Sequence, residues 1–119
     1  MEWRKAVQDN ADSKEGVLEK GKLLIEHMTV GRDWKIFTFK ADEWHYEIYS
    51  KRLHLRVYAG HGSKGEPVFS AGFYGYNPLW DYTEICKSDP NEAVLAVINR
   101  MRKHVAKQAA SLKELTEAL

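Results

Sequence analysis

Four short segments with the composition of β-strands follow one another between Trp34 and Tyr76, and they restrict the chain to folds built around a sheet. The segments are Trp34–Lys40, Glu43–Tyr49, Leu53–Ala59 and Val68–Tyr76. They are rich in β-branched and aromatic residues. The turns between them are short, apart from a glycine-rich loop over 60–67. We therefore expect an antiparallel sheet of four strands, because short connections join antiparallel neighbours.

The alternation of side chains predicts which face of this sheet is buried. In the second segment the apolar residues fall on even-numbered positions, and in the third they fall on odd-numbered positions. Such a change of phase requires a turn or a bulge, and Ser50-Lys51-Arg52 is the place for it. We expect a hairpin there, although the turn contains neither Gly nor Asn. The first segment, Trp34–Lys40, is apolar on both faces.

The strongest local signal opens a helix at the end of the chain. Asp89 is a good N-cap, Pro90 suits the first helical position, and Glu92 completes a capping box. Apolar residues then recur at alternating spacings of four and three, which predicts one continuous seam over about 26 residues, or roughly 39 Å. The seam consists of Val94, Ile98, Met101, Val105, Gln108, Leu112, Leu115 and Leu119.

This predicted helix is longer than the sheet beneath it. A sheet with strands of ordinary length is about 20 Å deep. The first half of the seam, from Val94 to Val105, should therefore pack on the sheet. The second half, with Leu112, Leu115 and Leu119, needs another cover: the N-terminal helix, a second copy of the chain or a partner protein. We therefore expect a homodimer through these three leucines as one alternative.

After the sheet, the sequence of Leu79–Lys87 predicts a fifth strand or an ordered loop.

The region before the sheet predicts helices, but less clearly than the C-terminal segment does. Trp3, Val7 and Ala11 would form one stripe on a short helix. Asp12 and Glu15 form a capping box for a second helix that would end with Gly31 as its C′ residue. Two internal glycines weaken this prediction, and a strand over 23–30 remains an alternative.

Length and composition indicate one domain. The 119 residues divide into an N-terminal helical region (1–33), an antiparallel sheet (34–87) and a C-terminal helix (89–119). The net charge of +1 argues against a general binder of polyanions. Cys86 is the single cysteine, so no internal disulfide requires an oxidising compartment. No signal peptide or membrane-spanning segment is evident, and we expect a cytoplasmic protein that does not enter a membrane.

No motif in the chain indicates a reaction. The five histidines show no metal-binding spacing. The glycine string after Gly60 fits G-x-G-x-x-G, but the following Glu66-Pro67 leads into a strand and not into a helix. Ser63 lacks the glycine that a nucleophile elbow needs two residues before it. We expect no catalytic residue, no cofactor and no metal, and therefore no enzyme.

Aromatic and basic residues around the third and fourth segments predict a binding surface. Tyr, Trp and Arg anchor protein interfaces because they bring large areas at modest entropic cost. The alternative is binding of single-stranded nucleic acid, with bases stacked on the rings beside a basic strip. The candidate contact residues are Tyr49, Lys51, Arg52, His54, Arg56, Tyr58, Lys64, Tyr74, Tyr76, Trp80 and Tyr82.

The layout also resembles a known kind of protein. A several-stranded sheet that ends in a Tyr-rich strand is followed by Ser88-Asp-Pro-Asn-Glu-Ala93, which opens an amphipathic helix. Over residues 34–107 this layout is similar to small phage-encoded accessory proteins, including some anti-CRISPR inhibitors. The resemblance implies a non-enzymatic protein that blocks or recruits a larger machine, and it assigns a role to no individual residue.

Together these patterns predict an α+β fold. It has an N-terminal helix, a four- or five-stranded antiparallel sheet, and a long C-terminal helix packed on one sheet face. The function predicted is protein binding, as a small inhibitor or accessory factor. The predicted core is Leu53, Leu55, Val57, Phe69, Phe73, Val94, Ile98, Met101 and Val105.

Overall fold

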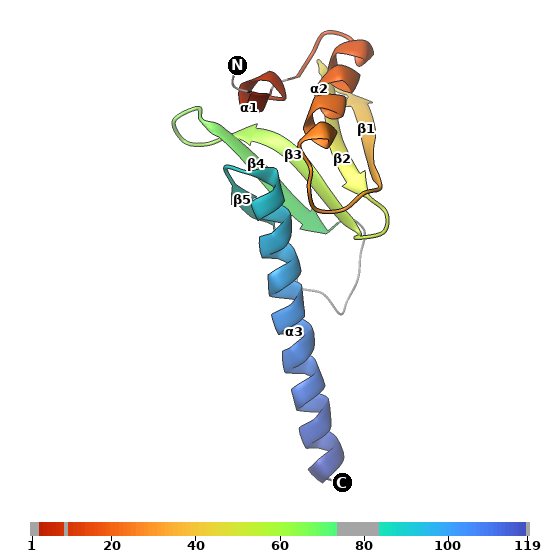
Figure 1. The fold of residues 1–119 in the computed structure, drawn as a ribbon, viewed down its shortest axis with the longest axis vertical. Helices are drawn as coiled ribbons and strands as arrows, with labels where there is room; N and C mark the ends of the chain where they lie inside the picture. Colours follow the sequence, from red (N-terminus) through yellow and green to blue (C-terminus); the bar gives the residue numbers. More distant parts are fainter. Residues whose placement is uncertain (1–2, 9, 74–83, 119) are drawn as a thin grey trace.

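A five-stranded antiparallel sheet carries its helices on one face, which makes the fold α+β (Figure 1). The computed structural model describes residues 3–8, 10–73 and 84–118. The strands lie side by side in chain order, from β1 to β5. The elements are α1 (Trp3–Ala6), α2 (Lys14–Glu26), β1 (Trp34–Lys40), β2 (Trp44–Ser50), β3 (Leu55–His61), β4 (Pro67–Phe73), β5 (Ile85–Lys87) and α3 (Pro90–Ala118).

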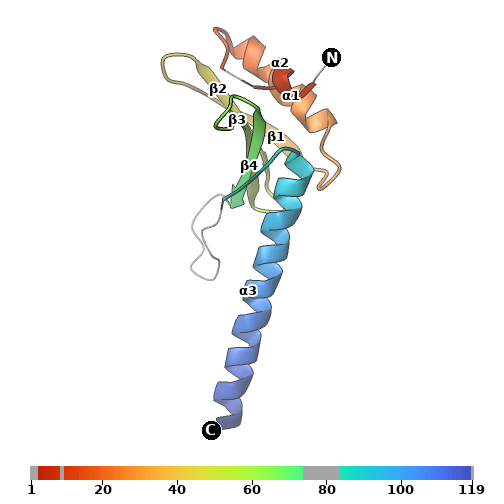
Figure 2. The same ribbon diagram turned by 90° about the vertical axis from the view of Figure 1, so that its left-hand side faces the viewer.

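The two main helices share one face of the sheet but cover different halves of it. Helix α2 packs on β1 and β2, and α3 packs on β3, β4 and β5. Figure 2 shows both helices on the same side, with the other sheet face uncovered by either. The core lies between these layers, where Ile48, Leu55, Val57 and Phe69 are fully buried. Within the described residues, neither α2 nor α3 covers the opposite sheet face.

The predicted core is confirmed except at its C-terminal end. Leu55, Val57, Phe69 and Val94 are fully buried. The partly buried side chains of Leu53, Phe73 and Ile98 pack against them. Val105 was wrongly placed in the core: 47% of it is exposed. Met101 is half-buried and outside the core cluster. Helix α3 leaves the sheet one turn earlier than its seam predicted.

The N-terminal region is helical, but with different boundaries from those predicted. Helix α1 ends at Ala6, so Trp3, Val7 and Ala11 do not share a helical stripe. Instead, Ala11 forms a β-bridge with Trp44. The N-cap of α2 is Ser13, whose hydroxyl accepts a hydrogen bond from the Gly16 amide at 3.1 Å. The prediction of Asp12 as the cap was therefore wrong by one residue.

Helix α2 also ends earlier than predicted. It stops at Glu26, with His27 as its C-cap, so Gly31 is not the C′ residue of this helix. The alternative of a strand over 23–30 is wrong as well. Gly31 has a positive φ of 82° in the connection to β1, and a Cβ there would lie 2.9 Å from the indole nitrogen of Trp34. The glycine is needed for the approach of the connection to this ring.

The β2–β3 turn covers 51–54, so β3 begins two residues later than predicted. His54 has a positive φ of 56° in this turn, which is unusual for a residue other than glycine. The Asp33 carboxylate accepts hydrogen bonds from the Ser50 hydroxyl at 2.6 Å and from the Arg52 amide at 2.9 Å. A residue outside the hairpin therefore supplies the stabilisation that Gly or Asn would otherwise give.

Asp89 caps α3 as predicted, since its side chain accepts a hydrogen bond from the Asn91 amide at 2.8 Å. Asn91 then links α3 to the α2–β1 connection. The Asn91 side chain donates through Nδ2 to the His27 carbonyl at 2.8 Å and accepts through Oδ1 from the Thr29 backbone amide at 2.7 Å. These bonds fix the start of the helix, whose far end projects well past the sheet (Figure 1).

Candidate functional site

The uncovered sheet face combines aromatic and charged side chains. Pairing between β1 and β2 sets Lys35 opposite Tyr49, Phe37 opposite Glu47 and Phe39 opposite His45. These residues alternate with the buried ones, and they therefore point away from α2 and α3. Arg56 of β3 lies opposite Tyr49 on the same face. We call this surface, with Tyr58 of β3, the open face.

Two phenylalanines form the apolar centre of the open face. Phe37 is 50% exposed and Phe39 is 44% exposed. Their ring centroids are 6.0 Å apart, and Phe39 stacks on His45 at 5.0 Å with an angle of 8° between the rings. Neither phenylalanine nor His45 was among the predicted contact residues. The signal was present in the sequence, because β1 has apolar residues on both faces.

Next to these rings, the two halves of the sheet separate. Strands β2 and β3 pair only over Ile48–Ser50 and Leu55–Val57, whereas β3 and β4 pair along their full lengths. Figure 1 shows the two hairpins diverging beyond that point. The N-terminal segment occupies the gap on the helix side: the side-chain amide of Gln8 donates to the Gly60 carbonyl, and the Tyr46 hydroxyl donates to the Val7 carbonyl.

A pocket of about 320 Å³ opens where the strands separate. Two of its walls are aromatic, with Phe39 on one side and Tyr58 on the other. Between them, Glu47 and Arg56 form an ion pair at 3.8 Å, and Arg56 also contacts Glu84 at 3.4 Å. The full lining is Asn10, Phe39, His45, Tyr46, Glu47, Arg56, Tyr58 and Ala59. The pocket therefore offers aromatic surface beside a charged group.

Burial affects the charged residues of this pocket. Desolvation raises the pKa of Glu47, the positive charge of Arg56 opposes that shift, and Glu84 adds to it. The Nε atom of Arg56 is buried without a hydrogen-bond partner in the part of the chain that the structure describes. Because two carboxylates flank one guanidinium, Arg56 does not contribute a net positive charge to the open face.

The predicted contact residues do not form one surface. Tyr49, Arg56 and Tyr58 lie together on the open face. Lys51, Arg52 and His54 lie in the β2–β3 turn, and Lys64 lies in the loop between β3 and β4. Tyr74, Tyr76, Trp80 and Tyr82 fall outside the described residues. The continuous basic strip that supported nucleic-acid binding is thus divided between two ends of the β3 strand, with a neutralised arginine between them.

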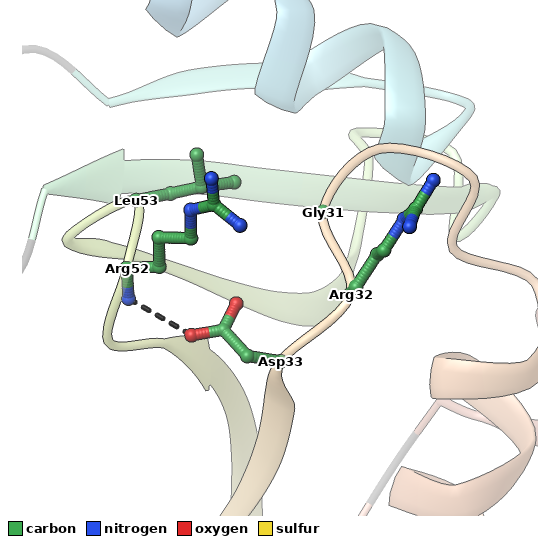
Figure 3. A pocket seen from close by; sticks show the side chains of 5 residues that line it. All are labelled: Gly31, Arg32, Asp33, Arg52 and Leu53. Carbon is green, nitrogen blue, oxygen red and sulfur yellow. Dashed lines mark hydrogen bonds between the residues drawn. The ribbon is translucent and has the colours of Figure 1, made fainter.

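Asp33 and Arg52 also line a second pocket of about 460 Å³ beside the β2–β3 turn (Figure 3). Its other lining residues are Gly31, Arg32 and Leu53. The hydrogen bond from the Ser50 hydroxyl, followed by that from the Arg52 amide, lowers the pKa of Asp33. The Asp33 carboxylate is turned toward the Arg52 amide in Figure 3, so its hydrogen bonds stabilise the turn and are not made to a group in the pocket.

The outer part of α3 is the second exposed apolar surface. Val105, Leu112 and Leu115 are 47%, 66% and 67% exposed. With Gln108 they continue the row of Val94 and Ile98 that packs on the sheet. We call Val105, Gln108, Leu112 and Leu115 the distal seam. The N-terminal helix does not cover it, because α2 packs on the far half of the sheet. That alternative was therefore wrong.

Among residues 3–8, 10–73 and 84–118, no group of three or more His, Cys, Asp or Glu side chains could hold a metal ion. Within the same ranges no helix combines the length and the apolar character needed to cross a membrane. Comparison with known proteins found no match to a protein-family model, to a curated protein or to a solved structure.

Proposed function

We propose that this chain is a non-enzymatic protein-binding module and that its contact surface is the open face centred on Phe37 and Phe39. The observation that carries the proposal is the half-exposed, stacked pair of phenylalanine rings on a sheet face that neither main helix covers. Contiguous apolar patches on the surface of a soluble domain commonly mark interaction sites.

The surroundings of the rings support a protein as the partner. Lys35 and the Glu47–Arg56 ion pair flank the phenylalanines, which gives an apolar centre with a polar rim. The adjacent pocket can take one side chain of a partner between Phe39 and Tyr58. β1 is also an edge strand, so an extended segment of a partner can pair with its outer edge.

Such a module acts by occupying a surface of a larger protein, which is the role of an inhibitor or an accessory factor. The resemblance to phage accessory proteins suggested this role. The open face supports binding, and the identity of the partner would decide between inhibition and recruitment. Nucleic acid is the less favoured ligand, because the neutralised Arg56 interrupts the basic strip.

The test compares three versions of the full chain in affinity enrichment from the source cells, followed by quantitative mass spectrometry. The versions are the natural sequence, Phe37→Ser with Phe39→Ser, and the matched control Leu95→Ser. Leu95 is 46% exposed but lies on α3, away from the open face. We expect one protein to be enriched by the natural chain and by the control, and about ten-fold or more less by the double variant.

Circular dichroism and thermal unfolding show whether each variant remains folded. In parallel, fluorescence anisotropy measures binding of a labelled single-stranded oligonucleotide over a series of salt concentrations. Oligonucleotide binding that falls steeply with salt, and that is equal for the natural chain and the double phenylalanine variant, would favour nucleic acid. The proposal fails if no protein is enriched in a manner that depends on Phe37 and Phe39.

A further inference from the structure

We infer that the distal seam of α3 pairs with the same seam of a second copy, and that the two helices run antiparallel. This inference concerns a different surface from the open face, and it holds or fails independently of the proposed function. It begins from the uncovered leucines: Leu112 and Leu115 are 66% and 67% exposed at positions that continue the buried row of the same helix. A helix that follows a heptad pattern beyond its own sheet presents the seam of a coiled coil.

The residues that flank the distal seam favour a second helix as its occupant. The positions beside it are His104, Ala109, Ser111, Thr116 and Ala118, of which the last four are small and uncharged. Small flanking residues let two helix backbones approach closely. The charged residues of the outer segment, Lys107, Lys113, Glu114 and Glu117, fall on the remaining side of the helix. The seam face is therefore wide, uncharged and suited to a helix of the same kind.

The fold decides the direction of pairing. The face of α3 that carries the distal seam is the face that packs on the sheet further up, at Val94 and Ile98. In a parallel pair joined by the seams, both sheets would need the same space between the helices. An antiparallel pair places the two sheets at opposite ends, and each outer segment runs past the end of the sheet of the other copy.

The register follows from matching the seam positions. When Val105 faces Leu115 of the second copy, Gln108 faces Leu112 of that copy, and the two-fold axis lies level with Ala110. From Val105 to Leu115 the paired region is about three turns long, at 3.6 residues per turn. An interface of this length is small, so we expect a reversible dimer with a dissociation constant on the order of micromolar.

The first experiment measures mass by sedimentation equilibrium on the full chain at several concentrations. We expect the mean mass to rise from monomer toward dimer over concentrations of about 1–300 μM. Leu112→Gln with Leu115→Gln should weaken association at least ten-fold. The matched control, Ala106→Gln with Ala110→Gln, places two glutamines on the charged side of the same helix and should leave it unchanged. A natural chain that stays monomeric throughout, or a control that weakens association as much as the leucine variant, overturns the inference.

The second experiment measures direction. A spin label on Asn99→Cys, in a chain that also carries Cys86→Ser, reports the distance between the two copies. Asn99 is exposed, and it lies eleven residues from the expected axis. An antiparallel pair separates the labels by about 33 Å along the helices, at 1.5 Å per residue. A parallel pair would hold them within roughly 20 Å, since paired helix axes lie about 8–10 Å apart. The short distance would overturn the antiparallel arrangement.

Discussion

At the scale of single residues, Asp33 shows how one side chain can replace a turn signal. The β2–β3 turn lacks Gly and Asn, and it holds His54 at a positive φ. Asp33 precedes β1, yet it accepts the hydrogen bonds that close this turn. The Ser50 hydroxyl, which donates to Asp33, in turn accepts from the Leu53 amide at 3.1 Å. The register of the hairpin therefore depends on a residue 17 positions before Ser50.

Asp33→Asn should lower stability more at neutral pH than in acid. The pKa of Asp33 is lowered in the folded chain from its ordinary value of 3.8, so the ionised carboxylate contributes stability above that pH. This contribution disappears as the pH falls through the lowered pKa. Urea unfolding of the natural and variant chains at pH 7 and pH 3 measures it. Asp42→Asn, in the exposed β1–β2 turn, is the control. An equal difference at both pH values would contradict the assignment.

At the scale of secondary-structure elements, close packing of α2 on β1 explains a glycine that weakens the helix in isolation. A Cβ on Gly21 would lie 2.8 Å from Cγ1 and 2.9 Å from Cδ1 of Ile36. Glycine costs about 1 kcal/mol relative to alanine inside a helix. The close contact between helix and strand is the reason that the chain accepts this cost.

Gly21→Ala should therefore destabilise the protein although it raises helix propensity. Overpacking costs about 1–3 kcal/mol, and the propensity gain offsets about 1 kcal/mol of it. We expect a net loss of about 1 kcal/mol in chemical unfolding. In a double-mutant cycle with Ile36→Ala, which removes the obstructing atoms, the two changes should be less than additive. Greater stability of Gly21→Ala alone would show that the helix can shift away from the strand.

At the scale of the whole molecule, one helix sets the shape. The described chain measures 61 × 26 × 25 Å, and the long dimension follows α3 (Figure 1). Within residues 3–8, 10–73 and 84–118, the thirteen buried apolar residues of the core all lie at or before Val97. The outer part of α3 therefore adds length and exposed apolar area but no core.

Truncation after Gln108 should leave the stability of the isolated domain unchanged, since the removed residues bury nothing within one copy. At low concentration, the full and truncated chains should unfold at the same urea midpoint. At high concentration, only the full chain should gain stability, by about 1.4 kcal/mol of dimer for each ten-fold rise in concentration. A truncated chain that unfolds earlier at low concentration would show that the outer helix stabilises its own domain.

Much of this fold could be predicted because its signals are local. Asp89 and Pro90 define the start of α3 through bonds within one helical turn, and the alternation in β3 places Leu55 and Val57 in the core. The candidate site was predicted only in part. Tyr49, Arg56 and Tyr58 were found from composition, but Phe37 and Phe39 were assigned to a sheet and not to a surface. Because β1 is apolar on both faces, its sequence could not show which of the two faces the helices would leave uncovered.

The sequence by itself determined the order of strands β1 to β4 and the start of α3, because alternation and helix capping act between residues a few positions apart. Only the tertiary structure decided where the sheet separates, that Glu47 and Glu84 neutralise Arg56, and that α3 leaves the sheet before Val105. Each of these depends on contacts between segments that are distant along the chain. The hydrogen bond from the Tyr46 hydroxyl to the Val7 carbonyl is of the same kind, because it joins residues 39 positions apart. The free energy of such contacts depends on how all the elements pack together, and no short stretch of sequence records it.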